Sequence, residues 1–296
     1  MRIFQVDAFT RTRFTGNPAT VVLDADGHDD ATLGAVAREF AHAEVAFVLA
    51  PAGADHDVRL RFFNSRKEAP FVGHATIAAH TVLLALGRRG VGVSRQHSGT
   101  GILEVRAIDG TDDAPLIEFR QTVPQLDAPL PLKTTLRVAE ALRLPGTQLH
   151  EVLPARIARK GSTRLLVPVG DAGALDLLAP NVDTLIALGN ELGTDGFFVF
   201  SVDRGAASLS TQSRMFCPAL GIPEDPVSGN AHSMLAAYLW DLEQFDAGTT
   251  GFTGYQGRHV KRPGEVHVKL EVERGHLLAA HIGGRAVIVS EGTLAI

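Results

Sequence analysis

The sequence contains one short pattern twice, as EAPFVGHATIAAHT at 68–81 and as EDPVSGNAHSMLAA at 224–237. Each copy has a glutamate, then a glycine followed by a polar residue and alanine, and continues as an apolar run. Both runs read as helices that are apolar on every face, which is typical of helices buried on all sides. Each copy therefore predicts a sheet that curls around its own central helix.

The repeat extends beyond these two stretches. Gly229 follows Gly73 by 156 residues, and a nearby separation of 151 residues aligns Glu44 with Asp195. The first separation also relates three further pairs: Glu68 with Glu224, Pro70 with Pro226, and His74 with Asn230. We interpret the chain as a tandem of two similar halves. Chance similarity between apolar strands is the alternative.

The two halves are predicted to share one order of strands and helices, which gives an α+β fold with a mixed sheet in each half. Helices are expected at about 31–42, 74–86, 134–143, 182–192 and 230–242. A first strand of the second half is expected near 150–153, and the final strand at 286–289.

The domain boundary is predicted in the proline-rich stretch QTVPQLDAPLPLK at 121–133. Proline is excluded from helix interiors and central strands, so this stretch is expected to be a linker. The expected domains are residues 1–120 and 134–296, with the final strand free to return to the first half.

Composition limits the classes of function that the protein is expected to have. The net charge is −5, and the Lys and Arg residues are spread along the chain, so no surface for nucleic acid or an anionic membrane is indicated. The single cysteine, Cys217, excludes an internal disulfide and fits a reducing compartment. No apolar run reaches the length of a membrane span, and the N-terminus lacks an export signal. We expect a cytoplasmic protein that acts on a small molecule.

The two helix starts are the candidate binding site. Gly73 and Gly229 stand where an extended segment turns into the buried helix, so the first amides of each helix have no intrahelical partner. Two such N-termini at a domain interface would bind a carboxylate, with help from the helix dipoles. The alternative is that each glycine serves only a tight turn.

The motifs resemble those of the phenazine-biosynthesis PhzF-like family. They are DAFT…FTGNPA at 7–19, AEVAFV at 43–48, RFFNSRKEAPFVGHATIAA at 61–79, EDPVSGNAH at 224–232 and QG…RPG at 256–264. The resemblance covers nearly the whole chain. It implies the diaminopimelate-epimerase-like fold, which has two pseudo-symmetric halves, each a mostly antiparallel sheet around a central helix, with the active site between them.

Related epimerases carry a cysteine immediately before each helix glycine, whereas this chain has Val72 and Ser228 there. Racemisation by two thiols is therefore not expected. The resemblance instead implies that Glu44 is the acid/base, and a partly desolvated carboxylate at the start of a strand suits that role. Position alone would favour a solvated glutamate at a strand edge.

The resemblance also implies that His74 and Asp225 hold polar groups of the substrate, and that Ser228, Gly229 and Asn230 line the binding site. From the residues alone, His74 could be a core histidine and Asp225 a turn cap. Asn230 stands where the family usually has serine, and this difference changes the pocket.

The expected activity is isomerisation of a small carboxylated amine by proton transfer, as in dihydro-hydroxyanthranilate isomerisation. No cofactor and no metal is expected, because nucleotide-binding motifs and HExxH are absent and His74 and His80 do not share a helix face. A homodimer is implied by the resemblance. Two alternatives stay open, an epimerase of an unidentified amino acid and a binding protein without catalysis.

Overall fold

The computed structural model describes residues 1–40, 44–110, 114–205, 208–246 and 248–296. The chain forms two compact units. Unit 1 consists of Met1–Arg120 and Gly283–Ile296, and unit 2 of Gln121–Ile282. The chain therefore passes into unit 2 once and returns to unit 1 for its last strand.

Unit 1 contains, in chain order, β1 (Arg2–Ala8), β2 (Asn17–Val22), α1 (Asp30–Glu39), β3 (Val45–Leu49), β4 (Val58–Phe63), β5 (Glu68–Ala69), α2 (Gly73–Ala85), β6 (Gly92–Ser98), β7 (Gly101–Ile108), most of β8 (Leu116–Thr122) and β18 (Ala286–Thr293). The pairs β2–β3 and β4–β6 are parallel. The pairs β1–β2, β3–β4, β6–β7, β7–β8 and β1–β18 are antiparallel.

Unit 2 begins with β9 (Gln125–Leu126), α3 (Leu132–Ala141), β10 (Arg156–Lys160), β11 (Ser162–Pro168), α4 (Gly173–Asp176) and α5 (Val182–Leu192). It continues with β12 (Phe197–Arg204), β13 (Leu209–Cys217), β14 (Ile222–Asp225), α6 (Gly229–Asp241), β15 (Gly251–Gln256), β16 (Gly264–Glu273) and most of β17 (His276–Gly284). The proline-rich stretch belongs to this unit, because β9 pairs with β10.

The strand pairing of unit 2 repeats that of unit 1. The pairs β11–β12 and β13–β15 are parallel, whereas β10–β11, β12–β13 and β15–β16 are antiparallel. Apart from β9, α3 and α4 in unit 2 and β18 in unit 1, each unit thus runs strand, strand, helix, strand, strand, short strand, buried helix and three strands. The predicted α+β fold with two similar halves is confirmed.

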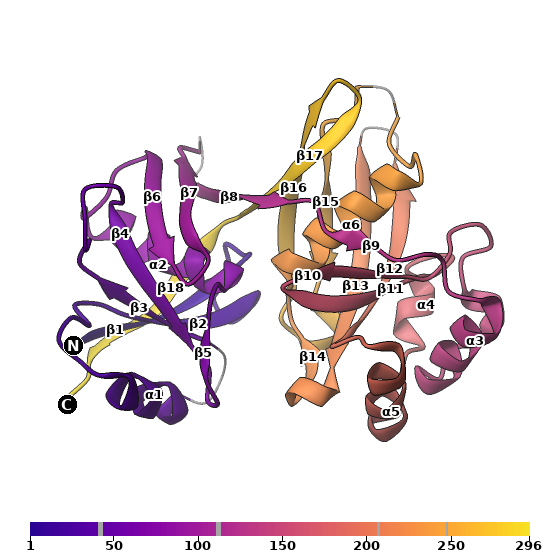
Figure 1. The fold of residues 1–296 in the computed structure, drawn as a ribbon, viewed down its shortest axis with the longest axis horizontal. Coiled ribbons are helices and arrows are strands. Elements are labelled where there is room, and N and C mark those ends of the chain that lie inside the picture. The colour runs from indigo at the N-terminus through magenta and orange to yellow at the C-terminus, as the bar shows by residue number, and fades with distance from the viewer. Residues whose placement is uncertain (41–43, 111–113, 206–207, 247) are drawn as a thin grey trace. The chain divides into compact units, whose positions relative to one another are not determined.

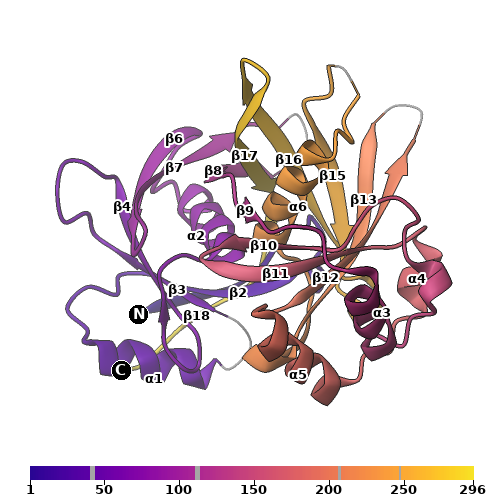
Figure 2. The same ribbon diagram turned by 45° about the vertical axis from the view of Figure 1, so that its right-hand side comes forward.

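One helix lies at the centre of each unit (Figures 1 and 2). Every residue from Ala75 to Leu83 in α2 is buried, and so is every residue from Ala231 to Leu239 in α6. Helix α2 packs against β1, β2, β3 and β18, and α6 against β10, β11 and β16. The apolar character of both helices on all faces is therefore explained by strands that surround them.

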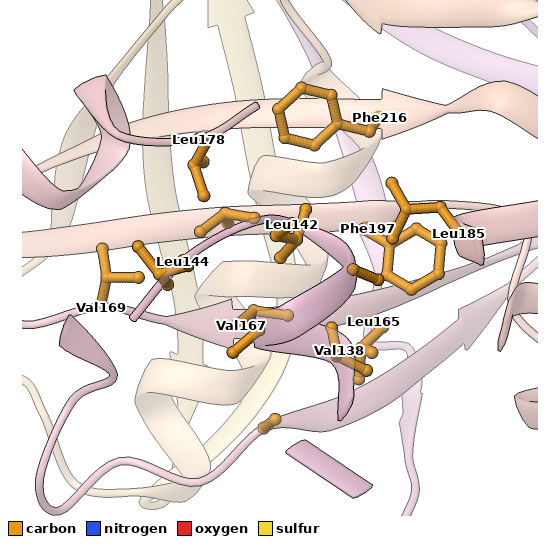
Figure 3. Close-up of a cluster of buried hydrophobic side chains, with 14 of the residues drawn as sticks. Val138, Leu142, Leu144, Leu165, Val167, Val169, Leu178, Leu185, Phe197 and Phe216 are labelled. Carbon is orange, nitrogen blue, oxygen red and sulfur yellow. The ribbon is translucent and has the colours of Figure 1, made fainter. Parts of the chain in front are cut away.

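The outer face of each sheet carries the amphipathic helices. In unit 2, α3, α4 and α5 cover a cluster that includes Val138, Leu142, Leu165, Leu185 and Phe197 (Figure 3). In unit 1, Leu33 and Ala37 of α1 pack on Phe47. Among the described residues, no helix combines the length and the apolar composition that crossing a bilayer requires.

The predicted helices are present within a few residues, although the last predicted residues of the first helix, 41–42, lie outside the described residues. The strand expected at 150–153 is wrong. The His150 Nδ1 atom accepts hydrogen bonds from the amides of Val152 and Leu153, and this local bonding replaces strand pairing.

Several strands escaped prediction, namely β10, β14 and the two-residue β5 and β9, together with β6 and β15. In β6 the buried positions are polar, Ser94, Gln96 and Ser98, so the usual alternation of apolar and polar residues is missing. In β15 the glycine at 254 is required by packing, because a Cβ atom there would lie 2.2 Å from His232 Nε2.

Each unit fixes the strand before its central helix with the same pair of side chains. Arg61 donates to both carboxylate oxygens of Glu68 at 2.8 and 2.7 Å, and Arg214 donates to Glu224 at 3.0 and 2.8 Å. The unit 2 pair is 10% and 12% exposed, whereas the unit 1 pair is 24% and 42% exposed. The repeat thus includes an equivalent arginine–glutamate pair in each unit.

The two pairs differ in burial, so their contributions to stability should differ. We expect Glu224→Gln to lower the free energy of unfolding by about 3 kcal/mol, because it leaves a buried guanidinium partly unpaired. The matched Glu68→Gln variant should lose about 1 kcal/mol or less. Denaturant unfolding of both variants measures the difference, and equal losses would contradict the assigned role of burial.

Candidate active site

The residues Glu44 and His74 come together in unit 1. Glu44 directly precedes β3, and His74 is the second residue of α2. The Glu44 Oε2 atom lies 3.5 Å from His74 Nε2, and the side chains are 24% and 12% exposed. His74 Nε2 is closed to solvent and has no hydrogen-bond partner among the described residues. A half-buried carboxylate therefore lies next to an imidazole nitrogen that is closed to solvent.

The N-terminus of α2 has no side-chain cap. Its N-cap is Val72, whose side chain cannot accept a hydrogen bond. The first intrahelical hydrogen bond runs from the Thr76 amide to the Val72 carbonyl at 2.9 Å. The preceding amides of the first turn are therefore left for other acceptors. Because the positive end of the helix dipole lies at His74, this end favours a negative charge.

The start of α6 in unit 2 is more fully bonded. Ser228 is the N-cap, and its Oγ atom accepts from the amide of Ala231 at 3.3 Å. Asn230, predicted to line the site, donates from Nδ2 to Ser162 Oγ at 2.8 Å. The hydroxyl of Ser228 thus has a capping role, and Asn230 links the helix to β11.

His232 anchors the same turn from inside the unit. Its Nδ1–H donates to the Ser228 carbonyl at 2.7 Å, and burial lowers the pKa of this histidine to about 4. The ring is therefore neutral near pH 7, with a single donor that is committed to the helix start. Sequence reasoning missed this residue, because a histidine within an apolar helix gives no distinguishing signal.

The segment between β14, whose last residue is Asp225, and α6 is held by the side chain of Gln256. Gln256 Nε2 donates to the Asp225 carbonyl at 2.7 Å, and its Oε1 accepts from the Ser228 amide at 3.1 Å. Gly257 has φ 89°, and a Cβ atom there would lie 2.7 Å from the Pro226 carbonyl oxygen. The QG pair at 256–257 therefore fixes the loop that follows Asp225.

The strand register shows which positions of the two units correspond. Arg61 lies over the Phe63 ring and Arg214 over the Phe216 ring, each 5.0 Å from the centroid. These equivalent pairs align Phe63 with Phe216. In the ladders, Phe63 faces Val45 and Phe216 faces Phe197. These pairings make Val45 the counterpart of Phe197.

Gly196 therefore occupies the position of Glu44 in the repeat. The sequence alignment placed Asp195 there, and the register corrects it by one residue. A Cβ atom on Gly196 would lie 2.5 Å from Cys217 Sγ and 3.3 Å from Arg164 Cδ. Burial raises the pKa of Cys217 to about 12, so its thiol stays protonated near pH 7. The position of Glu44 therefore has no counterpart carboxylate in unit 2.

Comparison with known proteins places these features in a family. The sequence model described as phenazine biosynthesis-like protein, PhzC-PhzF, matches residues 6–292. The chain belongs to this family. It is 34% identical to the uncharacterized isomerase YddE of Escherichia coli K12, over 100% of this chain and 98% of that protein.

A second relative is the trans-2,3-dihydro-3-hydroxyanthranilate isomerase of Pseudomonas chlororaphis, which is 27% identical over 98% of both chains. Among solved structures, a PhzF-family protein of Bacillus anthracis has a TM-score of 0.88 at 27% identity, over 100% of this chain and 99% of that one. The PhzF-family chain is accordingly an enzyme of the isomerase class.

The wider fold is also recognised. A probable proline racemase from Agrobacterium radiobacter has a TM-score of 0.64 at 16% identity, over 100% of this chain and 93% of that one. At this identity the likeness concerns the fold alone. It agrees with the diaminopimelate-epimerase-like architecture of the PhzF family.

The Gln256 contacts lead to a prediction about the loop before α6. Gln256→Ala should speed hydrogen exchange of the Ser228 amide about tenfold or more, because the acceptor for that amide is lost. Gln256→Glu keeps the acceptor and should change the exchange less. Exchange followed by NMR, with the Thr76 amide of α2 as internal reference, measures both.

Gln244→Ala is the matched control, because Gln244 bonds the Leu242 carbonyl away from this loop. An unchanged Ser228 amide in Gln256→Ala would show that Gln256 does not hold the loop.

Proposed function

We propose that this PhzF-family isomerase moves a proton between two carbon atoms of a small carboxylated amine, with Glu44 as the acid/base. The observation that carries the proposal is the carboxylate of Glu44 at 3.5 Å from His74 Nε2, at the uncapped N-terminus of α2. The Pseudomonas chlororaphis relative, named for dihydro-hydroxyanthranilate, supports a substrate of that chemical class.

The proposed reaction is balanced without any added reactant. The Glu44 carboxylate takes a proton from one carbon, the electron pair shifts along the adjacent double bond, and the resulting carboxylic acid returns the proton to another carbon. His74 orients the carboxylate and can donate to a polar group of the substrate. Amides in the first turn of α2 stabilise negative charge that develops on the substrate.

The remaining predicted residues are assigned to binding. Asp225 is proposed to hold a polar group of the substrate, at the end of β14, where Gln256 donates to its carbonyl. The amides of Gly73 and Gly229 are proposed to receive its carboxylate, and Asn230 and Ser228 to shape the surrounding pocket. A homodimeric state and a cytoplasmic location belong to the same proposal.

Epimerisation by two opposed carboxylates has less support. Such a reaction needs a second base, and the repeat has Gly196 where unit 1 has Glu44. A single carboxylate that removes and returns the proton fits isomerisation better. Catalysis is also favoured over simple binding, because a half-buried carboxylate next to a buried imidazole nitrogen is an arrangement typical of acid/base sites.

The direct test is proton NMR of trans-2,3-dihydro-3-hydroxyanthranilate in deuterated buffer with the wild-type protein and with Glu44→Gln. We expect the wild type to convert it with deuterium incorporation, and the variant to be slower by about 10²-fold or more, because acid/base catalysis typically contributes that much. Glu104→Gln, an exposed glutamate of β7, is the matched control.

A Glu44→Gln variant with wild-type rates would exclude Glu44 as the base. If the wild type leaves this compound unchanged, the hydroxyanthranilate class is wrong, and other carboxylated amines become the next substrates to test.

A further inference from the structure

Arg164 of β11 lies on the same side of the unit 2 sheet as the central helix. Side chains alternate along a strand, and Leu165 and Val167 belong to the cluster under the outer helices. Arg164 and Ser162 therefore lie on the opposite face. Ser162 accepts a hydrogen bond from Asn230 in the first turn of α6. Arg164 is two residues farther along that face.

The guanidinium of Arg164 is poorly partnered for a side chain that is only 11% exposed. Within the described ranges of the chain, its one hydrogen bond runs from Nη1 to the carbonyl of the neighbouring Thr163 at 2.8 Å. Its Nε atom is closed to solvent and has no partner among the described residues. The Asp195 carboxylate is 3.9 Å away and accepts its hydrogen bonds from Thr163 instead.

Two other arginines of unit 2 are equally buried and bond more acceptors than Arg164 does. Arg214, with a side chain 10% exposed, bonds Glu224 through two atoms and two backbone carbonyls through a third. Arg156, 11% exposed, bonds the Asp127 carbonyl and Asp241. Leaving a buried cation with so few acceptors is costly, so the bonding of Arg164 differs from that of a structural arginine.

Arg164 also lies beside Gly196, the position that corresponds to Glu44 in the repeat. Its Cδ atom, together with Cys217 Sγ, takes the space that a side chain on Gly196 would enter, and Gly196 corresponds to Glu44. Unit 2 thus places a fixed positive charge beside the position at which unit 1 places its carboxylate. The position of the carboxylate is a glycine in unit 2, and the positive charge beside it comes from the neighbouring strand β11.

We propose that Arg164 is a substrate-binding residue that pairs with the carboxylate of the substrate. A guanidinium presents several N–H donors in a plane and suits a carboxylate better than any other side chain. Pairing with the ligand supplies the acceptors that the free protein lacks. This inference rests on the proposed function and deepens it, since it makes the anionic group of the substrate essential for binding.

The test compares Arg164→Gln with Arg156→Gln, the equally buried control that is paired with a carboxylate and a backbone carbonyl. Thermal unfolding without ligand comes first. We expect Arg164→Gln to unfold at the same temperature as the wild type or higher, because removing a poorly paired buried charge relieves its cost. Arg156→Gln should unfold at a lower temperature.

Binding is then measured with two anions, 2-amino-3-hydroxybenzoate and sulfate. For 2-amino-3-hydroxybenzoate, the Kd of Arg164→Gln should rise about 10- to 100-fold, the loss expected for hydrogen bonds to a charged group. The Kd of Arg164→Lys, which keeps the charge but not the paired donors, should lie between those of the wild type and of Arg164→Gln. Low-millimolar sulfate should raise the unfolding temperature of the wild type and of Arg156→Gln more than that of Arg164→Gln, with chloride at equal ionic strength as the reference.

The outcomes separate this inference from the proposed function. If sulfate stabilises in an Arg164-dependent way but the aromatic amine does not bind the wild type, Arg164 stands as an anion site and the substrate class is wrong. If Arg164→Gln lowers the unfolding temperature as Arg156→Gln does and leaves both anions bound as in the wild type, Arg164 is structural and the inference is overturned.

Discussion

Burial of one helix on every side is the constraint on which the rest of each unit depends. Helices α2 and α6 have no solvent-facing stripe, so strands must surround them, and polar groups gather at the helix starts. At α2 the backbone amides of the first turn lack a side-chain cap. An all-apolar helix therefore determines both the curl of the sheet and the place where polar chemistry can occur.

The repeat keeps the scaffold and changes the groups near the helix starts. Both units retain the arginine–glutamate pair before the helix and a glycine packed against the loop proline, since Cβ atoms on Gly99 and Gly257 would meet Pro70 and Pro226. The chemistry has diverged. Unit 1 has a carboxylate next to an imidazole, whereas unit 2 has a glycine, a protonated thiol and a guanidinium in the corresponding region.

Much of the fold could be predicted from the sequence because burial leaves a periodic pattern. The central helices and the two-fold repeat were found in this way. Strands β6 and β15 were not, since inward-facing Gln96 and a glycine forced by His232 break the pattern. Hydrogen bonds that His150 accepts from the following amides likewise turned an apparent strand into a bend.

The candidate site could be predicted in part. The resemblance pointed to Glu44 and His74 separately, but their contact depends on how β3 lies beside α2, which no local pattern reveals. Gln256 and Arg164 gave no signal of their own. Their importance follows from hydrogen bonds made or missing within unit 2, and the one-residue shift from Asp195 to Gly196 required the strand register.

The central claim is that Glu44 and His74 act as one unit in proton transfer. It is tested most directly by the rate of deuterium incorporation into the isomerised substrate for Glu44→Gln, His74→Asn and the double variant. If the two act together, the double variant will be within about threefold of Glu44→Gln alone, because removing the second member of a unit adds little. If the rate loss of the double variant equals the product of the two single losses, Glu44 and His74 act independently, and the account is contradicted.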